Sequence, residues 1–301
     1  MAKITTPAME KFYKKQAKRK YKKSTPLGEV FRKLRRDKRA MVGLVIFCLL
    51  ILVALFPGVI TKYDYAYQDY KNIHALPCAE HLFGTDHLGR DIFCRVVYGT
   101  RVSLGISIAG VVGALVIGGI LGAVSAFYGG TTDNIIMRIM DILGAIPSTL
   151  LAISIAAVLG KGIINLVLAM GVSSIPLYAR VVRANVLTVK SKDYIEAGRC
   201  VGASDIRLIL QHMIPNAMGP IIVQATFGVA SSILMIAGLS YIGLGIAPPT
   251  PEWGSMLSDA KQYIQQFFHP MIFPGIAIFL TSFSLNVLGD GLRDAFDPKL
   301  K

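Results

Sequence analysis

The sequence predicts an all-α polytopic membrane protein, and three observations lead to this fold class. Only 17% of the 301 residues are charged whereas 53% are hydrophobic, and the mean hydropathy is +0.54. A soluble domain carries about 25% charged residues because its surface must meet water. The apolar residues also gather in stretches long enough to span a bilayer, and the basic residues gather outside those stretches. This pattern excludes an ordinary soluble enzyme.

Six apolar stretches are predicted to be transmembrane helices, because a helix that rises 1.5 Å per residue needs about 20 residues to cross the hydrocarbon. They are residues 41–60, 102–127, 139–159, 163–178, 218–241 and 271–288. Pro147 predicts a kink in the third stretch, and Pro176 predicts the end of the fourth. Gly118 and Gly122 in the second stretch favour close packing within the bundle over a special dimer contact.

The N-terminal 40 residues predict the orientation in the membrane. They contain 15 of the 32 Lys and Arg residues against three acidic residues, and they run directly into the first apolar stretch. By the positive-inside rule this segment stays in the cytoplasm, which is a simpler explanation than contact with nucleic acid. No cleavable signal peptide is expected, because the first apolar stretch begins only at residue 41. Six spans then place both termini in the cytoplasm.

The same topology divides the chain into five segments. They are a basic cytoplasmic segment at 1–40, a first transmembrane helix at 41–60, an extracytoplasmic loop at 61–101, a core of five transmembrane helices at 102–288 and a cytoplasmic tail at 289–301. The core includes a cytoplasmic loop at 180–216.

Three arginines lie in or beside the first outer loop, against the positive-inside rule. They are Arg90, Arg95 and Arg101. Asp86 and Asp91 are close enough in sequence to offset two of them.

Motifs for catalysis or energy coupling are absent from the sequence. The only Gly-Lys pair, Gly160-Lys161, is followed by Gly162 and so does not complete a Walker A motif. Neither H-E-x-x-H nor G-x-S-x-G occurs. The centres of the predicted spans are almost free of ionisable residues, which an ion-coupled carrier would be expected to show. We interpret the bundle as a passive pathway driven by another component. An ion-coupled secondary transporter and a polytopic membrane enzyme are the alternatives from other classes.

The first outer loop contains a group of His and Cys residues, namely His74, Cys78, His81, His87 and Cys94. His and Cys are transition-metal ligands, but this spacing matches no standard site, so ordinary polar loop residues are the favoured interpretation and no metal is expected. A disulfide between Cys78 and Cys94 is left open.

The cytoplasmic loop contains start and stop signals for two short helices. Ser191 or Asp193 can cap the first, and Gly202 can end it in the left-handed conformation. Ser204 can cap the second, which Pro215 is expected to end. An apolar face at helical spacing is predicted on the second helix, formed by Ile206, Ile209, Leu210 and Met213. Such a pair of helices can hold a cytoplasmic partner or pack on its own bundle, and the pattern favours neither.

This loop resembles a motif of the binding-protein-dependent ABC importer permeases. In that family E-A-A is followed by three residues, a Gly, nine further residues and I-x-L-P. The matching residues are Glu196-Ala197-Gly198, Gly202 and His212-Met213-Ile214-Pro215, with the spacing kept. The departures are Gly198 for the last Ala, His212 for the Ile and Ile214 for the Leu.

Two outer segments resemble the oligopeptide, dipeptide and nickel branch of the same family. The first reads Gly84-Thr85-Asp86-His87-Leu88-Gly89-Arg90-Asp91. The second is PPTPEWGSML at residues 248–257, which includes Pro249, Trp253 and Gly254. The resemblance covers about residues 30–298. Both outer segments are hypothesised to meet a solute-binding protein or to cover the pathway, and structural loop packing is an equally strong alternative.

The resemblance implies a type I ABC importer permease fold and one half of a membrane pathway for di- or oligopeptides, with nickel or a nickel chelate as the alternative cargo. It implies a homologous second permease, two cytoplasmic ATPase subunits and an extracytoplasmic solute-binding protein. The location would be the cytoplasmic membrane of a bacterium or archaeon. This chain would bind lipid but no nucleic acid and no cofactor, since ATP and Mg²⁺ would be held by the ATPases.

The resemblance also assigns an ATPase-coupling loop, formed by Asp193, Tyr194, Glu196, Ala197, Gly198, Gly202, Ala203, His212 and Pro215. Glu196 is expected to pair with a basic group of the ATPase, and Gly202 to permit the turn between the helices. The sequence assigns no catalytic and no substrate-binding residue.

Overall fold

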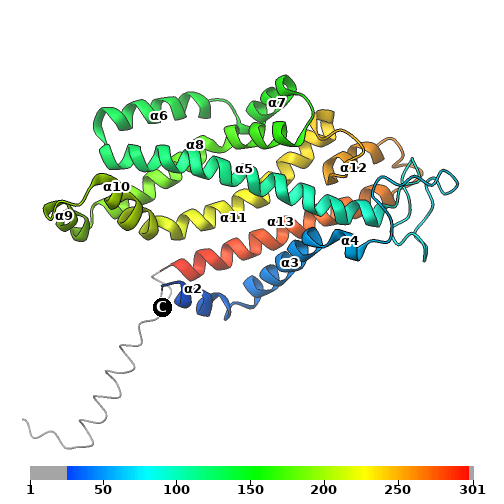
Figure 1. Cartoon of the computed structure of the whole chain (residues 1–301), viewed down its shortest axis with the longest axis horizontal. Helices are drawn as coiled ribbons and strands as arrows, with labels where there is room; N and C mark the ends of the chain where they lie inside the picture. The colour runs from blue at the N-terminus through cyan, green and yellow to red at the C-terminus, as the bar shows by residue number, and fades with distance from the viewer. Residues whose placement is uncertain (1–25, 298–301) are drawn as a thin grey trace, which may run out of the picture.

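The computed structural model describes residues 26–297, which form a long bundle of α-helices (Figure 1). In chain order the elements are α2 (Pro26–Leu34), α3 (Lys38–Leu55), α4 (Pro57–Ile60), α5 (Ile92–Tyr128), α6 (Gly130–Gly144), α7 (Ser148–Leu159), α8 (Ile163–Lys190), α9 (Asp193–Cys200), α10 (Asp205–Arg207), the π-helix η1 (Leu208–Met213), α11 (Ile214–Leu239), the π-helix η2 (Ser240–Leu244), α12 (Trp253–Ala260) and α13 (His269–Phe296). Within this range the only β-type pairing is an isolated bridge between Thr85 and Asp91. The predicted N-terminal segment lies largely outside the described residues.

Five helical spans are long and apolar enough to cross a membrane, and the pair α6 and α7 makes a sixth if it is counted as one bent span. The two helices of this pair meet at 78°. The predicted kink at Pro147 is therefore a complete break. Pro147 has an extended backbone (ψ 131°) and precedes the first residue of α7, and a proline disfavours helix in the residue before it.

Helix α8 continues to Lys190, so the prediction that Pro176 ends this span is wrong. A proline inside a helix removes one N–H donor. Ile175, Pro176 and Tyr178 are nevertheless all buried in the bundle. Packing of this turn against its neighbours decides the conformation, since tertiary contacts commonly override local helix propensity.

Helices α5 and α8 pack tightly through the small residues of α5. A Cβ on Gly118 would lie 2.7 Å from the carbonyl oxygen of Ile175, and one on Gly122 would overlap the carbonyl oxygen of Ala179. These contacts let the two backbones touch, as small residues do between helices in lipid. The prediction that the two glycines serve packing within the bundle is confirmed.

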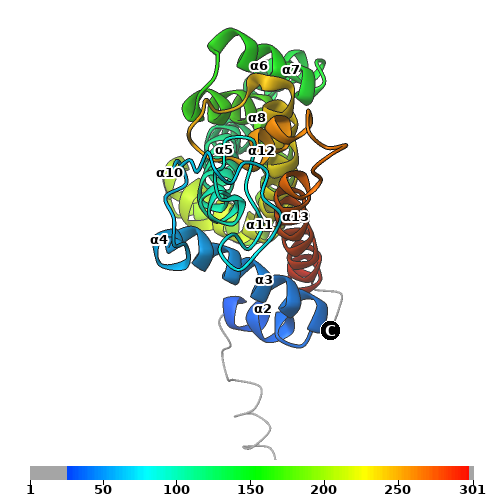
Figure 2. The same cartoon turned by 90° about the vertical axis from the view of Figure 1, so that its right-hand side faces the viewer.

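The two ends of the bundle carry different segments of the chain (Figure 1). Figure 2 views the molecule from the end that carries residues 61–91. We call this the loop end; it also carries residues 245–268. At the opposite end, here the terminal end, α2 lies beside the last turn of α13, and Lys33 Nζ donates a hydrogen bond to the carbonyl oxygen of Asp297 (3.0 Å). Helix α9 also lies at the terminal end (Figure 1). Both ends of the described chain therefore lie on one side of the bundle.

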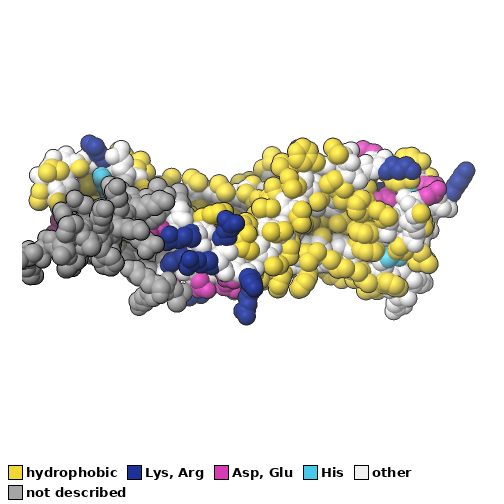
Figure 3. All heavy atoms as spheres, turned by 90° about the horizontal axis from the view of Figure 1, so that it is seen from below, with side chains coloured by type: hydrophobic (Ala, Val, Ile, Leu, Met, Phe, Trp, Pro, Cys, Tyr) yellow, Lys and Arg dark blue, Asp and Glu magenta, His cyan; other side chains and the backbone are white. Residues whose placement is uncertain are grey.

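Seen from below, the molecule shows a continuous band of apolar side chains, with Lys and Arg side chains gathered toward the terminal end (Figure 3). On α3 this band is formed by Val42, Val45, Leu49, Leu52 and Leu55, each of which is at least half exposed. A helix this apolar that leaves its side chains uncovered suits a lipid environment.

Candidate functional site

Helix α9 carries the first part of the loop motif, and Ile195 is its one buried residue. Ile195 is buried, whereas Asp193, Glu196 and Ala197 are exposed. The predicted N-caps are wrong: Lys192 occupies the cap position without a side-chain bond, and the Ser191 hydroxyl donates to the carbonyl oxygen of Thr188 (3.2 Å). Asp193 is instead the first residue of the helix, where its negative charge interacts favourably with the positive end of the helix dipole.

The end of α9 is the predicted left-handed turn at Gly202, where φ is +78°. The N–H of Gly202 donates to the carbonyl oxygen of Arg199 (2.9 Å), and that of Ala203 donates to the carbonyl oxygen of Gly198 (3.1 Å). This pair of hydrogen bonds is a Schellman motif. The turn brings Gly198 against Leu208, because a Cβ on Gly198 would lie 2.9 Å from Cδ2 of Leu208.

The second predicted helix does not end at Pro215. Residues Asp205–Leu244 form one continuous helical path through α10, η1, α11 and η2, and Ser204 makes no side-chain cap. In the π-helical turn the N–H of Ile214 bonds to the carbonyl oxygen of Ile209, five residues back. This wider turn accommodates Pro215, which has no N–H to donate. His212 lies in the same turn with its side chain exposed.

The predicted apolar face of this second helix is divided in the structure. Met213 is fully buried and Ile209 half-buried, whereas Ile206 and Leu210 are 69% and 58% exposed. Two further apolar side chains of the loop are also uncovered, Tyr194 at 47% and Val201 at 84%. We call Tyr194, Val201, Ile206 and Leu210 the exposed loop surface. Residues 26–297 leave these side chains uncovered, and exposed Glu196 lies on the same short helix as Tyr194.

At the loop end, Asp86 organises the first outer motif. Its Oδ1 accepts hydrogen bonds from the backbone N–H groups of Leu88 and Arg90 (2.9 Å each). Its Oδ2 pairs with Nε of Arg90 (2.6 Å) and lies 3.7 Å from Nε of Arg95. Both arginines are buried. One carboxylate therefore offsets two of the three arginines that depart from the positive-inside pattern.

Asp91 has a different role from the predicted offset of an arginine. Its Oδ1 accepts the N–H of Cys94 (2.7 Å) and so caps α5, while its Oδ2 lies 2.8 Å from Nδ1 of His81. Both side chains of this second pair are buried. A carboxylate at a helix N-cap satisfies backbone donors that have no partner inside the helix.

The glycines and the threonine of this motif close the loop on itself. Gly84 and Gly89 have φ values of +77° and +73°. A Cβ on Gly84 would overlap the carbonyl oxygen of Ala75, and one on Gly89 would overlap that of Asp69. Thr85 is buried, and its hydroxyl oxygen accepts the N–H of Ala75 (2.8 Å). The motif therefore depends on these residue types to fold.

The second outer motif contacts the first through Arg95, whose Nη1 donates to the carbonyl oxygen of Pro249 (3.2 Å). Trp253 is fully buried, and its Nε1 donates to the carbonyl oxygen of Val96 (3.1 Å). A Cβ on Gly254 would lie 2.5 Å from Cα of Ala237, so α12 touches the α11 backbone. The two motifs form one packed unit. This packing agrees with the alternative in which these segments serve to build the outer loops.

Glu252 is a buried residue of this unit that the sequence interpretation missed. Its two carboxylate oxygens accept the N–H groups of Gly254 and Ser255 (2.8 Å each), which caps α12. Burial raises the pKa of the Glu252 carboxyl, although these hydrogen bonds act in the opposite direction. A Glu two residues before the Gly254-Ser255 pair was the available signal, but Glu is not among the usual capping residues.

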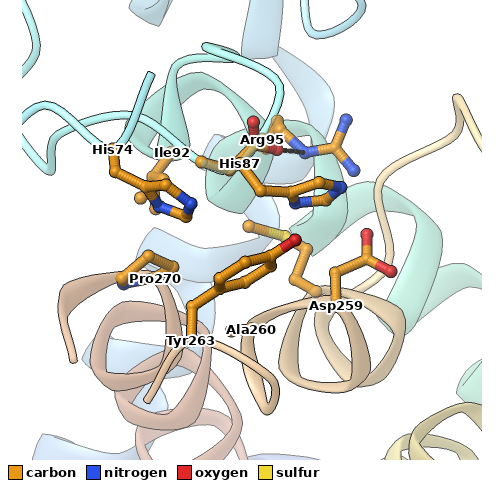
Figure 4. A pocket seen from close by; sticks show the side chains of 10 residues that line it. His74, His87, Ile92, Arg95, Asp259, Ala260, Tyr263 and Pro270 are labelled. Atoms are coloured by element: carbon orange, nitrogen blue, oxygen red, sulfur yellow. Dashed lines mark ion pairs between the residues drawn. The ribbon is translucent and has the colours of Figure 1, made fainter. Parts of the chain in front are cut away.

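Two histidines of the loop end, His74 and His87, line a small cavity of about 20 Å³. Figure 4 shows His74 and His87 above Tyr263 and Pro270, with Arg95 and Asp259 at the other side. The His74 ring stacks on that of Phe267, with centroids 4.4 Å apart. Burial lowers the pKa of His74. Between residues 26 and 297 no group of three or more His, Cys, Asp or Glu residues is placed to hold a metal ion.

The disulfide that the sequence left open is not formed. Cys78 and Cys94 both carry free thiols. Cys78 is exposed, whereas Cys94 is buried and its Sγ donates to the carbonyl oxygen of Tyr63 (3.0 Å).

Comparison with known proteins gives the family of this architecture. Residues 114–301 match the family described as the inner membrane component of binding-protein-dependent transport systems, which covers more than half of the chain. The chain belongs to this family. Residues 25–77 also match the N-terminal transmembrane domain of oligopeptide transport permease C.

Curated relatives extend this match over almost the whole chain. The permease is 44% identical to the dipeptide transport system permease protein DppC of Alkalihalophilus pseudofirmus, over 93% of this chain and 92% of the relative. It is 46% identical to the glutathione transport system permease protein GsiD of Escherichia coli, over 92% of both chains. These relatives place it among dipeptide- and glutathione-type ABC permeases. The chain is a multi-pass transport subunit whose family has no ATPase site of its own.

A solved structure shows the same fold at low sequence identity. The inward-facing MetNI methionine ABC transporter includes a chain that superposes with a TM-score of 0.54 at 18% identity, over 67% of this chain and 97% of that one. The predicted ABC importer permease fold is confirmed.

Proposed function

We propose that this permease forms half of the membrane pathway of an ATP-driven importer for di- or oligopeptides. The exposed loop surface at the terminal end carries this proposal. Its four apolar side chains lie in α9, at the end of α9, in α10 and in η1, and all are uncovered. Clustered exposed apolar side chains mark sites of protein contact. The family supports an ATPase as the partner that covers them.

In this proposal α9 is the element that a cytoplasmic ATPase holds. Glu196 offers a carboxylate beside the apolar contact, and Ile195 and the Gly198–Leu208 contact join α9 to the bundle. Asp193, Ala197 and Ala203 shape the helix and its end, while His212 and Pro215 begin the long path into α11. A movement of the ATPase is thereby passed to membrane-spanning helices. ATP and Mg²⁺ belong to the two ATPase subunits and not to this chain.

The remaining partners follow from the same assignment. The terminal end, with its gathered Lys and Arg side chains, is the cytoplasmic side, so both termini are cytoplasmic. The loop end then faces an extracytoplasmic solute-binding protein, and a homologous second permease completes the pathway. The relatives named for dipeptide and glutathione transport support a peptide cargo in a bacterial inner membrane, while a nickel chelate is the alternative cargo.

Reconstitution tests this proposal. The permease, its second permease, the two ATPases and the binding protein are placed in vesicles, and uptake of dialanine and glutathione is measured with and without ATP. ATP-dependent uptake is expected, with no ATP hydrolysis by the permease alone. Uptake by the permease alone under an ion gradient would overturn the proposal.

The Glu196→Arg variant tests the coupling role. It is expected to insert and assemble but to lower both uptake and binding-protein-stimulated ATP hydrolysis. Asp290→Arg is the matched control, because Asp290 is also an exposed acidic residue but lies in α13, outside both the coupling loop and the loop end. Equal activity of the two variants would refute the role of Glu196.

A further inference from the structure

A cavity of about 300 Å³ lies among α5, α7, α8 and α11, away from both candidate sites. Its lining residues come from near the middle of α5, α8 and α11, where the surroundings are otherwise apolar. The polar residues among them are Ser148, Ser173, Ser174, Tyr178, Gln224, Ser231 and Ser232. None of the lining residues is charged.

Tyr178 lines this cavity, and its buried hydroxyl group lacks a hydrogen-bond partner in the part of the chain that the structure describes. Tyr178 is 1% exposed, and its Oη has no hydrogen-bond partner among residues 26–297. A buried hydroxyl without a partner is costly, so most are satisfied. Gly228 on α11 makes room for this oxygen, because a Cβ there would overlap it.

The serines present acceptor groups to the same space. Ser173 and Ser174 each donate their hydroxyl hydrogen to the carbonyl oxygen of Met170 (2.9 Å), and Ser232 donates to that of Val229 (2.8 Å). Each hydroxyl oxygen keeps lone pairs that can accept a further hydrogen bond. Gln224 adds both a donor and an acceptor, and its side chain makes no hydrogen bond within the described chain. A peptide backbone, which has N–H donors and C=O acceptors, matches this set.

We propose that this cavity binds the backbone of a peptide during its passage, with Tyr178 and Gln224 as the principal hydrogen-bonding groups. This inference rests on the proposed function and adds the permease's own contact with its cargo. Because the lining is neutral, it holds the backbone without selecting the charge of the peptide side chains. A charge introduced into the cavity should therefore create a preference that the native protein lacks.

The Gln224→Glu variant tests the proposal in reconstituted vesicles with an unchanged binding protein. Uptake of glutamyl-alanine and of lysyl-alanine is measured, and the ratio of the two rates is compared between proteins. Selection by the binding protein cancels in this comparison. The variant should lower the glutamyl-to-lysyl ratio about fivefold, since unlike and like charges at close range differ by more than 1 kcal/mol even in a partly screened site. Gln265→Glu, which adds the same charge to an exposed residue of the outer segment, should leave the ratio at the native value.

Tyr178→Phe gives a second measurement that does not depend on an added charge. Uptake should fall, while binding-protein-stimulated ATP hydrolysis stays at the native rate because the coupling loop is unchanged. An unchanged peptide ratio in Gln224→Glu, or native uptake by Tyr178→Phe, would overturn the assignment of the cavity while ATP-driven uptake by the native complex still stands. Absence of that native uptake would instead refute the proposed function itself.

Discussion

The carboxylate of Asp86 lies 2.6 Å from the guanidinium Nε of Arg90, and both side chains are buried at the loop end. Arg95 shares the same carboxylate oxygen at 3.7 Å and also binds the carbonyl oxygen of Pro249. Asp86 therefore neutralises two buried cations and helps hold two segments that are about 160 residues apart.

Asp86→Asn should destabilise the permease strongly, because it leaves Arg90 and Arg95 buried without their main counter-charge. Removing one partner of a buried pair typically costs about 3–5 kcal/mol. The melting temperature in detergent should fall clearly. Asp259→Asn is the control: Asp259 also pairs with Arg90, but at 3.6 Å and with a side chain 39% exposed. A similar fall in both variants would contradict the central position of Asp86.

Gly254→Ala should separate α12 from α11, because the added Cβ would lie 2.5 Å from Cα of Ala237, a backbone atom that cannot rotate away. Gly275→Ala makes the same change in α13, where no atom lies within 4 Å of the new Cβ. The first variant should melt at a lower temperature than the native protein. The second should melt at the native temperature or slightly above it, since Ala favours helix over Gly by about 1 kcal/mol. Equal melting temperatures would refute the close contact.

Gly202→Val should weaken the hold of the ATPase on the loop. The left-handed conformation at +78° costs a residue with a Cβ about 1–2 kcal/mol, and a β-branched one more. No atom lies within 4 Å of a Cβ built there, so the substitution changes the backbone energy without causing a steric clash of the Cβ. The amount of ATPase that co-purifies should therefore fall with Val, and should stay near the native amount with Asn, which tolerates this conformation. Equal recovery with Val and Asn would count against the turn.

The stability of the permease should carry a pH dependence from Glu252. Its folded-state pKa is raised above the ordinary 4.5, so the folded state binds the proton more tightly than the unfolded state does. The associated stability is complete below the unfolded pKa and is lost as the pH rises through the folded pKa. Glu252→Gln removes this ionisation. The melting temperature of the variant minus that of the native protein should therefore increase as the pH rises from about 4.5, and a constant difference would exclude the ionisation of Glu252 as the cause.

The sequence was sufficient to locate the apolar stretches and the turn at Gly202, because these depend on local properties, but not for the 78° break between α6 and α7. Span length follows from hydropathy, and a left-handed helix end requires a residue such as Gly. The continuations through Pro176 and Pro215 could not be found in this way. Burial of the turn around Pro176 and the π-helical turn before Pro215 override the local preference of proline, and both depend on tertiary structure.

For the candidate sites too, local sequence predicted some features, whereas others depend on tertiary packing. The spacing from Glu196 to Pro215 located the loop, but the exposure of Ile206 and Leu210 beside buried Met213 depends on how η1 packs. Sequence proximity paired Asp91 with an arginine, whereas its position directly before α5 makes it a cap. The cavity around Tyr178 joins four helices, and no local pattern connects their residues.

Helix α5 contains no proline, whereas α8 contains one and α11 and α13 contain two each. Its 37 residues extend about 55 Å at 1.5 Å per residue, which exceeds the hydrocarbon thickness. At the loop end, the Asp91 cap and the Arg95 hydrogen bond to Pro249 connect α5 to the outer unit. At the other end, Lys190 Nζ donates to the carbonyl oxygen of Phe127 (2.8 Å). Arg199 of α9 also lies over the Phe127 ring. Helix α5 therefore connects the coupling loop and the outer unit directly. In the proposed importer, a movement that the ATPase imposes on the coupling loop at one face of the membrane is transmitted through this single helix to the outer unit at the opposite face.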